Sequence, residues 1–391
     1  MISTIRRGLS RLISGLCLAI GAASAAPPPA AEAAPAAAAA AWPIHRGDAR
    51  LTGRTPERLD ESPALLWSVV LGSAPQGAPV IADGRVVVGT GDGLVHCLDL
   101  ETGRALWQAS AGAAIEGPPL LDAGMAFVGT TAGALRAFRL SDGTPAWTFL
   151  SEGPILGGAN RARNAAGQDC VVFGSHDMKL YCLDAREGVL RWSFETSNYV
   201  HGTPSIDGDR VVFGGCDGIL HVVGLEDGKE RHAVDVGTYI AAPVAVEAGV
   251  AYLGHYGGEV LGIDLATAAV RWRVSPSAPA EAFMAPPGLS EALVLASARD
   301  GVLHGLDRQT GASRWVFRSA GPALGGMVVG REAAAVASED GRLYGVSLAD
   351  GRRLWAYDVG SPLTTGVAVA GGRLVVGAQD GRLYAFRSGL K

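Results

Sequence analysis

Short apolar runs separated by turns rich in glycine and aspartate follow one another along most of this chain. In residues 91–107, GDGLVHCLDLETGRALW, an Asp-Gly turn precedes the apolar run 94–98, and the turn 101–103 precedes a run that ends in Trp107. Glycine adopts positive φ without steric cost, and aspartate hydrogen bonds to its own turn, so both turns suit tight hairpins. The pattern predicts short β-strands joined by tight turns.

This unit recurs with a nearly fixed period. Its first turn returns at positions 92, 132, 177, 217, 257, 300, 340 and 380, which are 40 to 45 residues apart. One tryptophan per unit keeps the same step, at Trp67, Trp107, Trp147, Trp192, Trp272, Trp315 and Trp355, and His232 occupies the remaining slot. A period of this length, with several strands in each unit, is typical of a β-propeller. We therefore predict an all-β fold, an eight-bladed β-propeller.

Each unit is expected to contribute four strands, A to D, from the centre of the ring outward. In the first unit strand A is 79–81, strand B is 86–89, strand C is 94–98, and strand D ends near Trp107. Small residues and glycine in strand A suit the crowded centre of a propeller. The recurring tryptophans are expected to pack between blades rather than to stack on a cofactor, and each buried one contributes about 2–3 kcal/mol by area.

An N-terminal strand is expected to close the ring. The run 64–71, ALLWSVVL, has the character of a strand D but has no turn motif before it. At the other end, 381–387, GRLYAFR, supplies a strand C, and no fourth strand follows it. We expect the Trp67 strand to complete the eighth blade as its outer strand, because an open ring would leave strand edges unpaired.

Residues 1–25 have the features of a signal peptide. Three arginines accompany the apolar run 12–22, which is followed by an A-x-A cleavage site ending at Ala25. The apolar run is too short to cross a bilayer, and no later segment does better. We expect cleavage near Ala25 and a periplasmic or secreted protein. Lipidation of Cys17 is the alternative, although Leu16 stands where bacterial lipoproteins place a small residue.

The remaining chain divides into three parts by composition. Residues 26–41 are nearly all alanine and proline and are expected to form a tether. Residues 42–63, which begin WPIHRGDARLTG, contain an aromatic residue and turn formers and are expected to dock on the propeller as an N-terminal arm. Residues 64–391 form the predicted propeller, which we expect to be monomeric.

Charge and cysteine content narrow the possible partners. The formal net charge is −5, and removal of the three arginines of the signal peptide takes it to −8. With no long basic run, nucleic acid is not an expected partner. Cys170 and Cys182 fall on adjacent strands of one predicted hairpin, where either a disulfide or two buried free thiols is compatible with the sequence.

The repeat resembles a known family. Its consensus, V-x-V-G-x-x-D-G-x-L-x-x-L-D-x-x-T-G-x-x-x-W, is seen at 86–107 and again at 293–315. It resembles the PQQ-like (pyrroloquinoline quinone-type) β-propeller repeat over about residues 64–391. Two groups share this repeat: the PQQ-dependent dehydrogenases, and periplasmic propellers similar to the scaffold subunit of the outer-membrane β-barrel assembly machinery, which bind partners and no quinone.

The repeat identifies the fold and not the function, and the missing dehydrogenase features favour a non-catalytic scaffold. Dehydrogenases of this group are longer, and they carry an adjacent Cys-Cys pair and Ca²⁺ ligands beside a catalytic aspartate. This chain has no adjacent cysteines, and its D–A loops are short. We therefore expect no cofactor, no metal and no catalytic residues, and a protein partner of the cell envelope, as in outer-membrane protein assembly. The alternative is a quinoprotein alcohol or sugar dehydrogenase that binds pyrroloquinoline quinone with Ca²⁺.

The candidate binding face is formed by the D–A and B–C loops, which share one side of a propeller. Its candidate residues are Glu116, Tyr199, His201, Tyr239, Tyr256, Glu281 and Phe283. Exposed aromatic side chains are common anchors of protein interfaces, although these could instead fill the channel mouth. Glu116, His201 and Glu281 have the chemistry of metal ligands, but a channel would separate them. Strand addition at an outer blade edge is a second binding mode.

Overall fold

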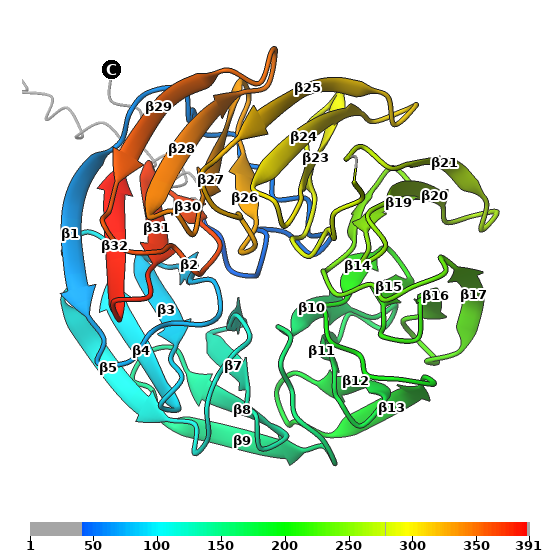
Figure 1. The fold of residues 1–391 in the computed structure, drawn as a ribbon. Coiled ribbons are helices and arrows are strands. Elements are labelled where there is room, and N and C mark those ends of the chain that lie inside the picture. The colour runs from blue at the N-terminus through cyan, green and yellow to red at the C-terminus, as the bar shows by residue number, and fades with distance from the viewer. Residues whose placement is uncertain (1–40, 278, 389–391) are drawn as a thin grey trace, which may run out of the picture. The chain divides into compact units, whose positions relative to one another are not determined.

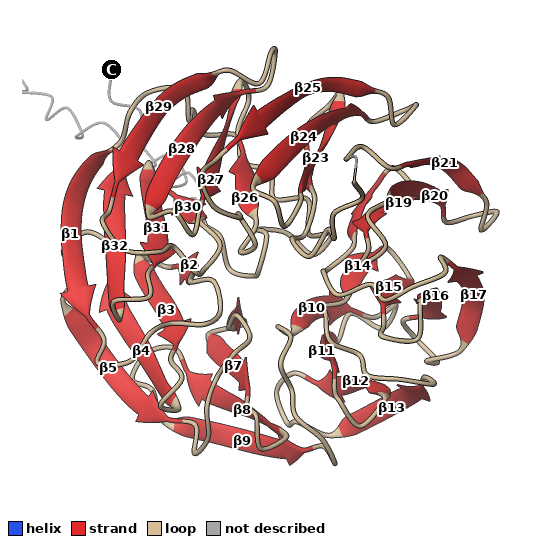
Figure 2. Cartoon of the chain, viewed as in Figure 1, coloured by secondary structure: helices blue, strands red, loops and turns tan. Residues whose placement is uncertain are grey.

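The computed structural model describes residues 41–277 and 279–388 (Figure 1). The predicted signal peptide, Cys17 with its possible lipidation, and the tether up to residue 40 lie outside the described residues. All regular structure in the described part is β-strand, joined by turns and loops (Figure 2). Within this part, no helix has the length and apolar character that crossing a membrane requires.

Eight antiparallel four-stranded sheets, the blades, surround a central axis, which confirms the predicted fold class (Figure 1). From the inner to the outer strand, blades one to four are β2 (Val80–Ala82), β3 (Arg85–Gly89), β4 (Leu94–Asp99), β5 (Ala105–Ser110); β6 (Leu120–Asp122), β7 (Met125–Gly129), β8 (Ala134–Arg139), β9 (Pro145–Leu150); β10 (Asn160–Arg163), β11 (Asp169–Gly174), β12 (Lys179–Asp184), β13 (Leu190–Glu195); β14 (Ser205–Asp207), β15 (Arg210–Gly214), β16 (Ile219–Gly224), β17 (Glu230–Asp235).

Blades five to eight have the same order. They are β18 (Ala245–Glu247), β19 (Val250–Gly254), β20 (Val260–Asp264), β21 (Val270–Val274); β22 (Gly288–Leu289), β23 (Leu293–Ser297), β24 (Val302–Asp307), β25 (Ser313–Arg318); β26 (Met327–Val329), β27 (Ala333–Ala337), β28 (Arg342–Ser347), β29 (Arg353–Asp358); β30 (Ala368–Ala370), β31 (Arg373–Gly377), β32 (Arg382–Arg387), β1 (Ala64–Val70). Strands B and C are almost entirely buried because neighbouring blades cover both faces, as in β19 and β23.

The N-terminal strand closes the ring, as predicted. β1 pairs antiparallel with β32, with Trp67 opposite Ala385 and Val70 opposite Arg382. The eighth blade therefore combines three strands from the C-terminal end with one from the N-terminal end (Figure 1). This pairing gives the last blade the outer strand that its own segment lacks.

Each tryptophan joins its blade to the next one. The Trp107 indole N–H donates to the carbonyl of Leu140 in the second blade at 2.9 Å. Its ring covers Gly143, whose φ is +74°, and a Cβ built there would lie 2.6 Å from the ring. The same donation runs from Trp67 to Leu100, Trp147 to Ala185, Trp192 to Leu225, Trp272 to Arg308 and Trp315 to Leu348. The tryptophans are therefore packing residues between blades.

Two junctions depart from this pattern. In the fourth blade His232 replaces the tryptophan, and Ala268 in the fifth blade occupies the glycine position with a φ of +59°. At the seventh blade, Trp355 donates to the carbonyl of Leu59 at 2.9 Å, because the eighth blade has no C–D turn of its own. The arm thus supplies the acceptor that a C–D turn provides elsewhere.

The arm follows the inner strands around the axis. Trp42 and Ile81 of β2 exchange two backbone hydrogen bonds of 2.8 Å. Further along, arm carbonyls accept backbone N–H groups of strand A in the second, fourth, fifth, sixth and seventh blades: Pro43 from Leu121, Ala49 from Ile206, Arg50 from Val246, Thr52 from Leu289 and Gly53 from Val329. In the third blade, the Asn160 side chain donates to Ala49. The arm therefore touches the blades one after another before it enters β1.

The register settles how the two cysteines of the third blade are arranged. Cys170 lies opposite Asp184 and Cys182 lies opposite Val172, so the two thiols share one buried face but are offset by two residues. The four described cysteines are free thiols. Diagonal neighbours in a sheet are about 7–8 Å apart, which exceeds the usual Cα separation of a disulfide.

Candidate binding face

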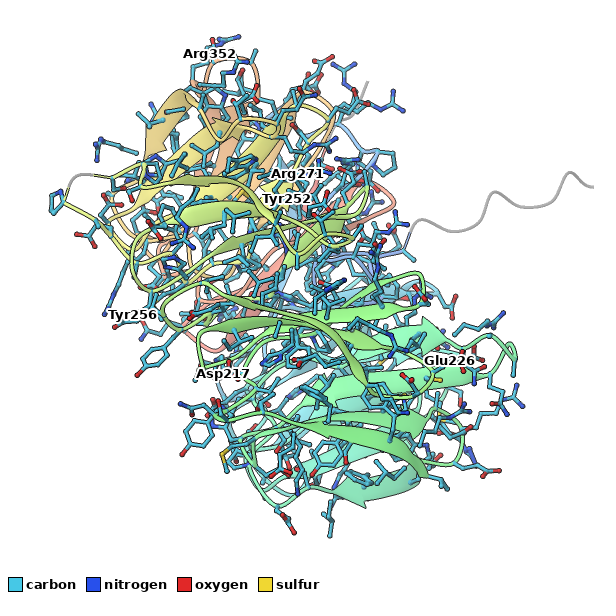
Figure 3. The ribbon with its side chains drawn as sticks, turned by 90° about the vertical axis from the view of Figure 1, so that its right-hand side faces the viewer. Asp217, Glu226, Tyr252, Tyr256, Arg271 and Arg352 are labelled. Atoms are coloured by element: carbon cyan, nitrogen blue, oxygen red, sulfur yellow. The ribbon has the colours of Figure 1, made fainter. Side chains whose placement is uncertain are left out.

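The D–A and B–C connections form one face of the ring, and the A–B and C–D turns form the other. In the side view, Asp217 and Tyr256 lie at one edge of the molecule, whereas Glu226 lies at the opposite edge (Figure 3). We use the name tyrosine face for the D–A and B–C side, because three exposed tyrosines lie on it.

Tyr199, Tyr239 and Tyr256 are 47%, 53% and 48% exposed. Tyr199 and Tyr239 occupy the same position of the D–A connection in consecutive blades, and Tyr256 belongs to the B–C turn of the fifth blade. The Tyr239 and Tyr256 rings lie 6.4 Å apart between centroids, and the Tyr256 N–H donates to the Tyr239 carbonyl at 3.1 Å. The tyrosines therefore extend over adjacent blades.

A histidine pair supports Tyr199. Its ring stacks on His176 with centroids 4.6 Å apart and planes within 6°. His176 Nε2 lies 3.1 Å from His201 Nδ1 of the next blade. Burial lowers the pKa of both histidines below its ordinary value, His201 lowers that of His176 further, and the Glu116 carboxylate opposes both shifts. The two histidines are thus neutral near pH 7, and the stacking on His176 fixes the orientation of the Tyr199 ring.

The channel mouth contains Glu116 and His201 but not Glu281. A cavity of about 180 Å³ lies there, and the equivalent D–A residue of every blade contributes to its lining. In the sixth blade this residue is Met284 and not Glu281. Below the cavity the backbones nearly touch, since a Cβ on Gly117 would lie 2.5 Å from the Gly157 carbonyl oxygen. Within residues 41–277 and 279–388, no three His, Cys, Asp or Glu side chains form a metal-binding group.

Phe283 lies in the core and does not belong to the exposed aromatic set. It is 1% exposed, and its ring packs edge-on against His304 with centroids 5.8 Å apart. Its Cβ fills the space over Gly254, where an added Cβ would lie 2.4 Å away. Ile115 and Ile155 cover Gly89 and Gly129 in the same way in other blades. This repeated apolar position in the D–A segment is the sequence signal that identifies Phe283 as a packing residue.

Two arm residues inside the ring could not be recognised from sequence. Arg46 is buried and donates to the backbone carbonyls of Pro287, at 2.9 Å, and of Met327. Burial lowers the Arg46 pKa to about 10, against the opposing effect of Asp48. Burial and the adjacent Arg46 charge lower the pKa of His45 to about 3. His45 lines the cavity at the channel mouth, and Arg46 links the arm to the sixth and seventh blades.

The opposite face holds the larger hollow. A cavity of about 1950 Å³ is lined by the arm and by A–B and C–D turns. Most of its arginines are paired with carboxylates of the protein: Arg54 contacts Glu247 at 2.7 Å, and Arg314 contacts Asp307 at 2.6 Å. Among the described lining residues, Arg331 is the arginine without an ion pair. The hollow is therefore large, and most of its charges are internally neutralised.

The sequence repeat, the eight blades and the closure of the ring by β1 define this chain as a PQQ-like repeat β-propeller. The profile of the family described as outer membrane protein assembly factor BamB matches residues 57–218, 158–237, 216–365 and 339–389. These matches span the propeller, and the chain belongs to this family.

Solved structures share the fold at low sequence identity. BamB from Moraxella catarrhalis superposes with a TM-score of 0.71 at 19% identity, covering 83% of this chain and 100% of that one. The quinohemoprotein alcohol dehydrogenase of Comamonas testosteroni gives 0.73 at 15% identity, covering 90% of this chain and 81% of that one. Both groups expected from the repeat thus appear as structural neighbours.

A curated relative matches over a short segment. The beta-alanine-activating enzyme of Mus musculus is 33% identical over 91 residues, which are 21% of this chain and 8% of that protein. A match of this length corresponds to about two repeat units.

Proposed function

We propose that this protein is a non-catalytic, protein-binding scaffold of the cell envelope and that the tyrosine face is its binding surface. The observation that carries the proposal is the set of half-exposed tyrosines, Tyr199, Tyr239 and Tyr256, on consecutive blades. Large amphipathic rings that remain accessible are typical anchors of protein interfaces.

The fold suits this role because the loops are held by a closed ring. Tyr199 is stacked on His176, and Tyr256 is bonded to the Tyr239 backbone, so little conformational entropy remains to be lost on binding. Membership of the BamB family and the predicted signal peptide are consistent with a role in outer-membrane protein assembly from the periplasm.

The alternative, a PQQ-dependent dehydrogenase, fits these residues poorly. Small-molecule sites are usually about 300–1,000 Å³ in volume, whereas the cavity at the channel mouth is about 180 Å³. In the large hollow on the other side, Arg54 and Arg314 are already paired with protein carboxylates and so are not free to hold those of a quinone.

Site-specific crosslinking tests the proposal. A photoreactive residue at Tyr239 or Tyr256 in the native envelope should capture one or a few defined protein partners. Thr102 and Thr310, exposed in C–D turns of the opposite face, are the matched control positions. Capture from the control positions alone, or from none of the four, would contradict the assignment of the binding surface.

A further inference from the structure

Negative charge is concentrated on the tyrosine face. Seven of the eight B–C turns hold a carboxylate, and the D–A connections add Glu116, Glu152 and Glu281. Among the described residues of these connections, Arg299 is the one Lys or Arg. At the strand ends beside them, Lys179 pairs with Glu152 at 3.3 Å and Arg273 with Glu259 at 3.5 Å, so the other carboxylates account for the excess negative charge. The opposite face differs because its turns themselves contain several Arg and Lys side chains beside their carboxylates, such as Arg104, Arg186 and Lys229.

Two of the carboxylates belong to segments near the exposed tyrosines. The Glu281 backbone runs alongside Gly258, two residues after Tyr256. Glu116 is exposed, and its charge acts on the two histidines that support Tyr199. An aromatic ring attracts a guanidinium or ammonium group through its electron-rich face, and a nearby carboxylate adds a charge-assisted hydrogen bond.

We propose that the tyrosine face recognises a basic segment of the protein partner, with Arg or Lys side chains over the tyrosines and paired with Glu116 and Glu281. This inference rests on the proposed scaffold function and specifies the chemistry of its partner. Charge complementarity favours arginine in particular, because its planar guanidinium stacks on a ring and pairs with a carboxylate at the same time. A segment that is neutral or acidic would gain neither contact.

A defined peptide series tests the inference on the full-length mature protein. Fluorescein-labelled (Arg-Gly)n, (Ser-Gly)n and (Glu-Gly)n peptides of equal length are titrated and followed by anisotropy at low and high salt. We expect (Arg-Gly)n to bind most tightly and to weaken as salt screens the charges. Equal binding of the three peptides, or preference for (Glu-Gly)n, would overturn the inference.

Paired variants separate this face from overall charge. The double variant E116Q/E281Q should weaken (Arg-Gly)n binding by about tenfold, the usual scale for losing close charge pairs. E187Q/E332Q removes the same charge from exposed positions on the opposite face and should change binding less than about twofold. Equal losses in both variants would mean that net charge, not this face, binds the peptide. Thermal melts of both variants verify that they are folded.

The failure of this inference is distinguishable from that of the scaffold function. If crosslinks from Tyr239 and Tyr256 identify a partner segment without Lys or Arg, the basic-segment inference is overturned and the binding surface stands. If those positions capture no partner, the binding surface itself is overturned.

Discussion

At the scale of single residues, six of the seven tryptophans on outer strands depend on a glycine in the next blade, with Trp355 as the exception. The ring occupies the space where a Cβ would be, and the indole N–H finds a carbonyl in the same turn. A buried indole without an acceptor would be costly, so the two features belong together. This explains why glycine and tryptophan recur in the T-G-x-x-x-W part of the repeat, although they act in different blades.

The exception at the fourth blade yields a prediction. H232W alone should destabilise the protein by about 1–3 kcal/mol through overpacking, because the indole would meet the Cβ of Ala268. A268G alone should stabilise it slightly, because the alanine φ of +59° is unfavourable for an L-residue. The double variant H232W/A268G should be more stable than the sum of the two changes. Denaturant titrations of all four proteins measure this coupling, and additive free energies would show that the two positions do not meet.

At the scale of elements, the arm is the part whose course the sequence did not reveal. Its docking was expected from Trp42 and the turn formers, but the path it follows is set largely by backbone hydrogen bonds to strands far away in the chain. Such bonds leave no periodic pattern of side chains. The strands of the blades were predictable because alternation and turn residues repeat eight times, and the pairing of β1 with β32 followed from the one strand that lacked a partner.

Removal of the arm should weaken the whole ring. Deleting 42–60 while keeping β1 exposes the partners of Trp42, Ile44, Leu51 and Leu59, all of which are buried. At about 1.5–3 kcal/mol per side chain, the loss should exceed about 5 kcal/mol. Calorimetry should show a much lower Tm, and deletion of 26–40, before the arm, is the control that should leave Tm unchanged. A 42–60 deletion that melts with the parent would show that the arm is only loosely attached.

At the scale of the whole molecule, the ring determines which predicted residues become accessible. Sequence reasoning placed the D–A and B–C loops on one face, but it could not separate Tyr239, which is exposed, from Phe283, which is buried. Phe283 occupies the D–A position whose side chain covers a glycine of strand B, as Ile115 does in another blade. This equivalence is recognised only when the blades are aligned with one another. Similarly, His176 and His201 come from different blades, and only ring curvature brings their nitrogens to 3.1 Å.

The same ring should make global stability sensitive to acid. Burial is the main cause that lowers the pKa of six of the eight histidines, namely His45, His96, His176, His201, His255 and His304. His221 is the opposite case. Burial opposes its charge, but Asp217 and Glu230, at 3.0 and 2.8 Å from its ring nitrogens, raise its pKa.

The directions of these pKa shifts predict that the free energy of unfolding falls below about pH 6.5. A histidine held neutral in the fold binds its proton only in the unfolded chain, so each one costs up to about 1.4 kcal/mol per pH unit below its unfolded pKa. His45, with a pKa of about 3, should alone cost about 1–2 kcal/mol at pH 5. His221 acts in the other direction, since its contribution is present below pH 6.5 and is lost as pH rises through its raised pKa.

Because six histidines have a lowered pKa and one has a raised pKa, the parent should unfold more easily at pH 5 than at pH 7 in denaturant titrations. H45Q should lessen the difference and H221Q should enlarge it, and an H45Q protein with the parent's full pH dependence would refute the role of His45.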